Sequence, residues 1–192
     1  MLHIGNYVKI TRNVSILCHD YSRSVWCEMG EYNNIGEAAT TRIGDNVFIG
    51  VNSTILMGSH IGNNSIVGAG ALVSGKFPDD VVIAGNPAKV ICTIDELYEK
   101  RKKTEIESAK TYVREWKNKF GKYPDIFEMT NAFAWLYLPH TQESVDKYAK
   151  LFDLNGVEKD IFIEKFLYSQ PIYNSFQDFI EECESETTRC GN

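Results

Sequence analysis

The sequence lacks the features that mark several large classes of protein. It has no apolar run long enough to cross a bilayer, and its first residues show neither the charged stretch nor the apolar stretch of a secretory signal. Basic residues are fewer than acidic ones, 20 against 26, and the net charge of −6 argues against an extended phosphate-binding surface. We therefore expect a cytoplasmic protein that neither inserts into membranes nor binds nucleic acid.

Cysteine is scarce and irregularly placed. The five cysteines are an odd number with no paired or metal-ligand spacing, which is typical of reduced thiols rather than a disulfide framework: Cys18, Cys27, Cys92, Cys183 and Cys190. The four histidines show no spacing that would bring three of them together, as a zinc hydratase would need. The sequence therefore predicts neither a disulfide nor a metal.

A period of six residues is present in the first half of the chain. Ile or Val recurs every sixth position, first over one short stretch and then over a longer one: Ile4, Ile10, Ile16, then Ile43, Ile49, Ile55, Ile61, Val67 and Val73. If the Ile or Val is counted as the first position of each six-residue unit, the second position is mostly Gly or a small residue. The fifth position is mostly small or β-branched. Internal repeats of this kind determine the fold.

Neither a helix nor a lone amphipathic strand has this period, since a helix needs apolar residues three and four apart and a strand needs alternation. A β-sandwich is disfavoured, because its strands recur at about 8 to 12 residues. A coil of three short parallel strands fits, with the branched residues stacked inside and Gly or Asn at the corners. Crossovers between parallel strands are generally right-handed, and the spacing itself does not show the hand of the coil.

The distance from Ile16 to Ile43 is not a multiple of six, so the segment from about residue 22 to 42 is predicted to leave the coil. It is rich in polar and aromatic residues, and long loops on rigid scaffolds are usually functional. Asp20 falls at an inward position, where an unpaired carboxylate is costly. Asp20 is therefore predicted to mark the point where the chain turns outward, with His19 beside the loop.

With these repeats, this break and the stretch Ala84-Gly85-Asn86-Pro87-Ala88-Lys89 in view, the chain resembles the hexapeptide-repeat acyltransferases, most nearly the bacterial sugar and polysaccharide O-acetyltransferases. The resemblance covers residues 1 to about 92. It implies a left-handed parallel β-helix, a homotrimer with sites between subunits, and acetyl-CoA as co-substrate. It also implies a sugar-like small molecule or glycan as acceptor.

The family's general base is a histidine just ahead of the loop, and the matching residue here is His19. An imidazole titrates near neutral pH and can take the proton of a sugar hydroxyl. Asp20 and Glu28 are the candidates to orient it, although neighbouring residues on a strand point to opposite faces. The candidates to contact the acceptor lie in the predicted loop: Tyr21, Ser22, Arg23 and Trp26. A covalent route through Cys18 is the less simple alternative.

The resemblance also assigns coenzyme A contacts. Val51 and Ala69 match positions near the thioester and pantetheine, Ser74 lies beyond them, and Lys89 matches a contact near the nucleotide phosphates. Where relatives often place a lysine after the serine, this chain has Gly75 and then Lys76. Either Lys76 takes over the phosphate contact or the loop is shifted by a residue.

The period changes after Cys92. Thr93 to Glu96 form a capping-box pattern, and apolar residues then follow at helical spacing until Gly121, which predicts one long helix. Four shorter helical segments follow, at about 125–138, 141–154, 157–168 and 174–183, separated by Pro139, Asn155-Gly156 and Pro171. The predicted organisation is therefore mainly β with α: a β-helix over 1–92, a helical domain over 93–184 with its aromatics in the core, and a polar tail over 185–192.

Three functions remain open at this level. O-acetylation of a sugar or surface-polysaccharide precursor, with His19 as the base in a direct transfer, is favoured by the mixed polar and aromatic loop. N-acetylation of an amino sugar or nucleotide-linked sugar would use the same machinery. A non-catalytic β-helix scaffold is disfavoured by the presence of His19 together with the stretch that resembles a coenzyme A site.

Overall fold

The computed structural model describes residues 1–153 and 158–189, in two compact units, Met1–Lys100 and Arg101–Asn192. The division falls inside the long helix α2, a few residues beyond the change of period. The predicted turn at Asn155-Gly156 and the thiol of Cys190 lie outside the described residues.

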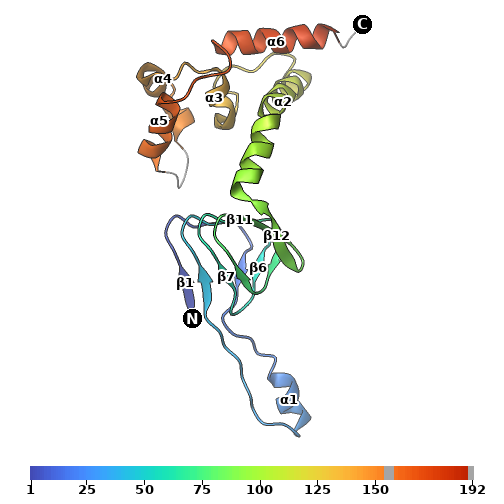
Figure 1. Cartoon of the computed structure of the whole chain (residues 1–192). Helices are drawn as coiled ribbons and strands as arrows, with labels where there is room; N and C mark the ends of the chain where they lie inside the picture. The colour runs from blue at the N-terminus through green and yellow to red at the C-terminus, as the bar shows by residue number, and fades with distance from the viewer. Residues whose placement is uncertain (154–157, 190–192) are drawn as a thin grey trace. The chain divides into compact units, whose positions relative to one another are not determined.

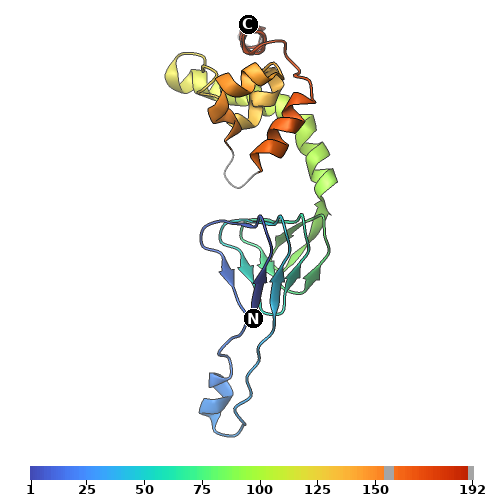
Figure 2. The same ribbon diagram turned by 90° about the vertical axis from the view of Figure 1, so that its left-hand side faces the viewer.

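Unit 1 is a coil of short parallel strands stacked into three sheets (Figures 1 and 2). One sheet has the order β1-β4-β7-β10, the second β2-β5-β8-β11 with β12 antiparallel to β11, and the third β3-β6-β9. The strands are β1 (Leu2–Ile4), β2 (Lys9–Ile10), β3 (Ser15–Ile16), β4 (Thr41–Ile43), β5 (Phe48–Ile49), β6 (Thr54–Ile55), β7 (His60–Ile61), β8 (Ile66–Val67), β9 (Leu72–Val73), β10 (Lys76–Phe77), β11 (Val81–Gly85) and β12 (Ala88–Thr93). The predicted parallel coil is thus confirmed.

The residues of the six-residue period form the core of this unit. Within the second sheet, Ile10 pairs with Ile49, Ile49 with Val67 and Val67 with Ile83. Ile49, Val67 and Ile83 are completely buried. A neighbouring glycine permits the stacking, because a Cβ on Gly50 would lie 2.6 Å from the backbone nitrogen of Ala69.

The period ends after Val73 because the next rung is shorter. Ile43 pairs with Ile61, eighteen residues further on, whereas Ile61 pairs with Phe77, only sixteen further on. Gly75, at φ +107°, makes the tight turn that removes the two residues. Lys76 therefore lies in strand β10, paired with His60, and not in a loop.

Side-chain amides and carboxylates stack at the corners of the coil. Asp45 accepts a hydrogen bond from the backbone N–H of Asn6 (2.6 Å) and donates its own N–H to the amide oxygen of Asn63 (2.8 Å). Asn63 in turn donates to Asp79 through its backbone (2.8 Å) and its side chain (3.2 Å). Asn46 and Asn64 adopt positive φ at the same corner, a conformation that Asn tolerates well.

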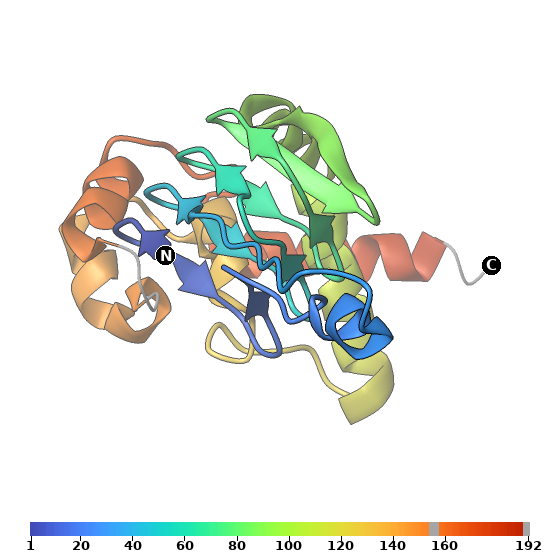
Figure 3. The ribbon, with the colours of Figure 1, turned by 90° about the horizontal axis from the view of Figure 1, so that it is seen from below.

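Within the part of the chain that the structure describes, no further coil is stacked on the outer side of the first coil. Ile4 and Ile10 occupy inward positions of the period, yet each is 44% exposed. Their counterparts one coil later, Ile43 and Ile49, are buried. The view from below (Figure 3) shows the stacked strands of unit 1 with helix α1 beside them in blue.

The long helix α2 (Ile94–Phe120) begins at the predicted capping box. The backbone N–H of Glu96 donates to the hydroxyl of Thr93 (3.1 Å), and the backbone N–H of Thr93 donates to the carboxylate of Glu96 (2.8 Å). Gly121, at φ +71°, ends the helix with a hydrogen bond to the carbonyl of Lys117. Both predicted ends of this helix are confirmed.

Unit 2 packs its helices around an aromatic core that includes Tyr137, Phe152, Phe166 and Phe179. An ion pair joins Lys110 to Glu182 at 2.6 Å. The elements after α2 are η1 (Asn131–Phe133), α3 (Ala134–Tyr137), α4 (Gln142–Lys147), η2 (Ala149–Phe152), α5 (Lys159–Leu167) and α6 (Phe176–Arg189).

Three predicted segments differ from these elements, and the one predicted over 141–154 is divided into α4 and η2. A continuous helix over 125–138 is wrong, because the Asp125 carboxylate accepts the N–H groups of Phe127 and Glu128 in a local turn and Thr130 is extended. Helix α6 continues past Cys183 to Arg189, into the predicted polar tail.

Candidate active site

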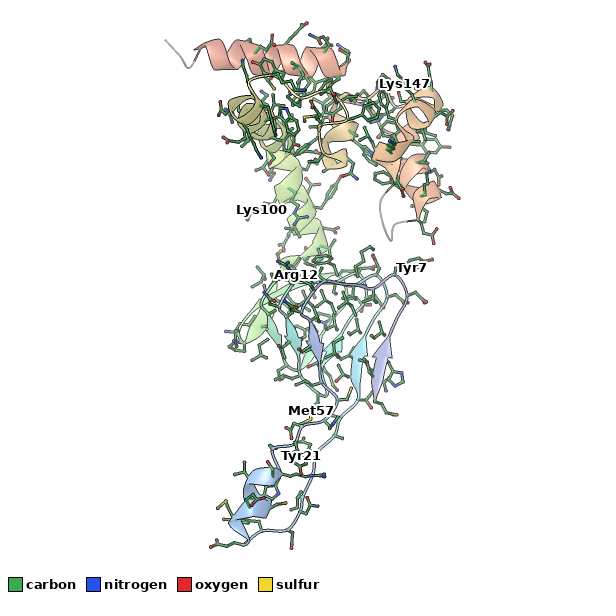
Figure 4. The ribbon with its side chains drawn as sticks, turned by 180° about the vertical axis from the view of Figure 1, so that it is seen from behind. Tyr7, Arg12, Tyr21, Met57, Lys100 and Lys147 are labelled. Atoms are coloured by element: carbon green, nitrogen blue, oxygen red, sulfur yellow. The ribbon has the colours of Figure 1, made fainter. Side chains whose placement is uncertain are left out.

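The chain leaves the coil between β3 and β4, over residues 17–40, which we call the excursion (Figure 1). Thr41 and Arg42 already pair with Leu2 and His3 in a sheet, so the excursion ends before the predicted residue 42. It contains one short helix, α1 (Ser24–Met29), which ends at Gly30 in the left-handed conformation and buries none of its residues. In Figure 4, Tyr21 of the excursion lies next to the corner of the coil that carries Met57.

Hydrogen bonds hold the two ends of the excursion together. The Thr41 hydroxyl donates to the carbonyl of Leu17 (2.6 Å), and the N–H of Ala39 donates to the carbonyl of Cys18 (3.0 Å). His19 and Ala38 form an antiparallel bridge directly beyond these bonds. The structure therefore fixes the backbone of His19 at the base of the excursion and leaves its side chain exposed.

The carboxylate of Asp20 is engaged by Ser22. It accepts hydrogen bonds from the Ser22 hydroxyl (2.8 Å) and backbone N–H (3.0 Å), and these bonds hold the pKa of the Asp20 carboxyl below its usual range, with a smaller contribution from the charge of His19. The imidazole of His19 makes no hydrogen bond within the described residues, so neither Asp20 nor Glu28, exposed on α1, is bonded to it.

This turn yields a prediction for Asp20. Ser22→Ala should move the pKa of the Asp20 carboxyl up toward its ordinary value, because the side-chain hydrogen bond is the largest cause of the depression. The ionised Asp20 carboxylate stabilises the turn fully when the pH is above the ordinary pKa of an Asp carboxyl. This stabilisation is lost as the pH falls through the lowered pKa of Asp20 in the folded protein. NMR titration of the side-chain carboxyl carbon measures the change, with Ser24→Ala as the control. An unchanged pKa in Ser22→Ala would contradict the assignment.

The predicted acceptor contacts all lie in the excursion. The Arg23 guanidinium lies over the ring of Tyr21, 5.3 Å from its centroid, and Tyr21 is 70% exposed. Trp26 is half-buried within α1, and its Nε1 is buried with no partner among the described residues. The excursion thus offers a fixed carboxylate and an exposed aromatic ring just before Ser22 in the sequence, and a guanidinium just after it.

The predicted coenzyme A contacts fall on two different corners of the coil. Val51 and Ala69 lie on successive coils at one corner, where the N–H of Gly70 donates to the carbonyl of Val51 (2.8 Å). Lys89 lies at the same end of the second sheet but two strands further on, in β12, since it pairs with Ala84 of β11, the residue that a Cβ on Gly68 would touch. Ser74 follows strand β9 at the next corner, and Lys76 lies beyond it in β10.

Sequence reasoning missed helix α1, which is too short to show a helical period. It also missed the shortened rung that places Lys76 beside His60. The described residues contain no group of three His, Cys, Asp or Glu side chains that could hold a metal ion. No described helix is both long and apolar enough to cross a membrane.

Residues 40–74 match a family model described as the hexapeptide repeat of succinyl-transferase. This stretch is therefore similar to the hexapeptide repeats of that family. Curated proteins that are similar to part of this chain include both an O-acetyltransferase and an N-acetyltransferase.

Three comparisons illustrate this likeness. The protein YvoF of Bacillus subtilis (strain 168), whose name assigns it to the acetyltransferases, is 39% identical over 103 residues, which are 54% of this chain and 54% of YvoF. The galactoside O-acetyltransferase of Lactococcus lactis subsp. lactis (strain IL1403) is 32% identical over 112 residues, 55% of this chain and 52% of that protein. A solved galactoside acetyltransferase in complex with coenzyme A aligns with a TM-score of 0.41 and 32% identity over 48% of this chain and 45% of that one. The chain thus spans about half the length of the curated relatives it matches.

Proposed function

We propose that this chain is an acetyl-CoA-dependent O-acetyltransferase that acts on a hydroxyl of a sugar or surface-polysaccharide precursor. The observation that supports it most is the exposed His19 held at the base of the excursion from a hexapeptide-repeat coil. The nearby Tyr21, Ser22 and Arg23 offer an aromatic face and polar groups of the kind that suit a sugar acceptor.

In the proposed reaction His19 acts as general base. It takes the proton of the acceptor hydroxyl while the oxygen attacks the thioester carbonyl carbon, and the carbon–sulfur bond breaks as the new ester bond forms. The imidazolium then returns the proton to the departing thiolate. Asp20 is proposed to act as a positioning residue, because its bonds to Ser22 shape the turn that directly follows His19.

The assembly of the site is part of the proposal. Val51 and Ala69 at one corner of the coil, with Lys89 further along the second sheet, would hold the pantetheine and the nucleotide. Ser74 at the next corner and Lys76 beyond it in β10 would complete these contacts. We propose a left-handed coil and a homotrimer, as the resemblance implies, so that each site lies between two subunits. Such a site would combine His19 of one copy with the coenzyme A corner of another.

The test is thiol release from acetyl-CoA by the full chain with a panel of neutral monosaccharides, oligosaccharides, amino sugars and nucleotide-linked sugars. Release that depends on a hydroxyl acceptor supports O-acetylation. Release with amino sugars alone, and product stable to the mild base that cleaves esters, would favour the N-acetylation represented among the relatives. No release and no binding of acetyl-CoA would contradict the enzyme and favour a scaffold.

A further inference from the structure

One face of the coil carries a line of cationic and imidazole side chains. In the sheet β1-β4-β7-β10, His3 pairs with Arg42, Arg42 with His60 and His60 with Lys76. All four side chains are exposed and point outward, since the residues that follow them along the strands are the inward ones. We call these four residues the basic column.

The basic column is not neutralised by the chain itself. None of its side chains forms an ion pair or a side-chain hydrogen bond within the described residues. The acidic residues at the adjoining corner, Asp45 and Asp79, have their carboxylates engaged by Asn6 and Asn63. The chain has a net charge of −6, whereas this row contains basic residues and no carboxylate, so its local charge is opposite in sign to that of the whole chain.

The spacing of the basic column suits an extended ligand. Neighbouring strands lie about 4.8 Å apart, so four positions cover roughly 14 Å in a line. The strand N–H groups of this sheet are used in pairing, so the face offers no cradle of backbone donors for a compact diphosphate. A guanidinium, an ammonium and two imidazoles at regular intervals offer donors to a chain that carries one carboxylate per repeating residue, and guanidinium binds carboxylate in a bidentate manner.

The basic column also begins where the candidate site lies. Arg42 follows directly after Thr41, whose hydroxyl closes the base of the excursion, and the N–H of Gly58 donates to the same hydroxyl (3.2 Å) two residues before His60. A polymer lying along the basic column would therefore pass the corner from which the excursion leaves, next to His19.

We propose that the basic column binds a carboxylate-bearing glycan chain and that this acidic glycan is the acceptor class. The inference rests on the proposed function for the identity of the acceptor. The binding itself is independent of catalysis and is measured without acetyl-CoA.

The experiment measures binding of the full chain to oligogalacturonate and to a neutral glucan oligosaccharide of equal length, at low and at high salt. Wild type should bind the acidic chain in preference, and binding should weaken with salt. The double variant Arg42→Gln/His60→Gln should lose about tenfold in affinity, since an exposed guanidinium contact and an imidazole contact are removed. The matched control Lys9→Gln/Arg12→Gln removes basic groups outside the basic column and should bind as wild type does.

Three results would overturn the proposal. Equal affinity of both double variants for oligogalacturonate would show that the basic column has no specific part. A raised KM for acetyl-CoA in Arg42→Gln/His60→Gln with oligogalacturonate binding unchanged would assign the basic column to the phosphates of coenzyme A. A changed oligomeric state of that variant in sedimentation velocity would make the face an interface between copies. Binding without any acetyl transfer would leave the basic column standing and remove only the proposed acceptor role.

Discussion

Replacing His19 by Ala is expected to lower acceptor-dependent thiol release by about a hundredfold to ten-thousandfold, the range over which a positioned general base accelerates proton transfer. The residue lies beside the hydrogen bonds that close the excursion, and its exposed side chain contributes no hydrogen bond within the described residues. The substitution should therefore remove the base and leave the fold intact. Binding of acetyl-CoA should be unchanged, because Val51 and Ala69 lie at another corner of the coil and Ser74, at the corner of the excursion, lies two coils further along.

The controls separate a base from a structural residue. His19→Gln keeps much of the side-chain size and a hydrogen-bonding amide but cannot take the proton, so it should be as inactive as His19→Ala. Asn33→Ala, an exposed change elsewhere in the excursion, should retain activity. The activity of the wild type should fall at acid pH as one group becomes protonated. The residual activity of His19→Ala and His19→Gln should not show this fall. Full activity in His19→Gln would exclude the residue as the base.

The repeat unit could be predicted in detail because its chemistry repeats along the chain. Inside the coil every rung needs a branched aliphatic residue, so the inward positions from Ile43 to Val73 are recognisable by identity as well as by spacing. The capping box at Thr93 and Glu96 was predictable for a similar reason, since two side chains bond each other's backbone across a fixed interval.

The basic column was hidden from the sequence by two changes of interval. Arg42 and His60 are one regular coil apart, but His3 joins them only across the excursion and Lys76 only across the shortened rung. A period shows which residues face inward and outward. It does not show which outward residues share a column once residues are inserted or lost at a corner.

The second half was less predictable because its helices are short and their ends depend on tertiary packing. The segment after Pro124 has helical composition, yet Asp125 holds a local turn and the aromatic ring of Tyr137 packs against Phe176 and Phe179. Contacts between residues far apart in sequence thus decide where α3 begins and ends.

Replacing a buried residue of the coil by Ala should lower the free energy of unfolding far more than the same replacement of its exposed partner. Ile49 is fully buried and pairs with Ile10, which occupies the same inward position in the first coil but is 44% exposed. Ile49→Ala should lower the free energy of unfolding of unit 1 by about 2 to 5 kcal/mol, because it leaves a cavity in a packed column. Ile10→Ala should cost about 1 kcal/mol or less, since less apolar area is withdrawn from burial.

Hydrogen exchange of peptides from residues 41–85 in increasing urea measures this difference without interference from the helical unit. Ile49→Ala should expose these amides at lower urea than Ile10→Ala. Equal losses in the free energy of unfolding would show that the outer side of the first coil is covered in solution. Ile10 can contribute as much as Ile49 only if it is buried as well. Sedimentation velocity on the same two variants would then show whether a second copy provides that cover, since only an intermolecular cover would make the Ile10→Ala effect depend on protein concentration.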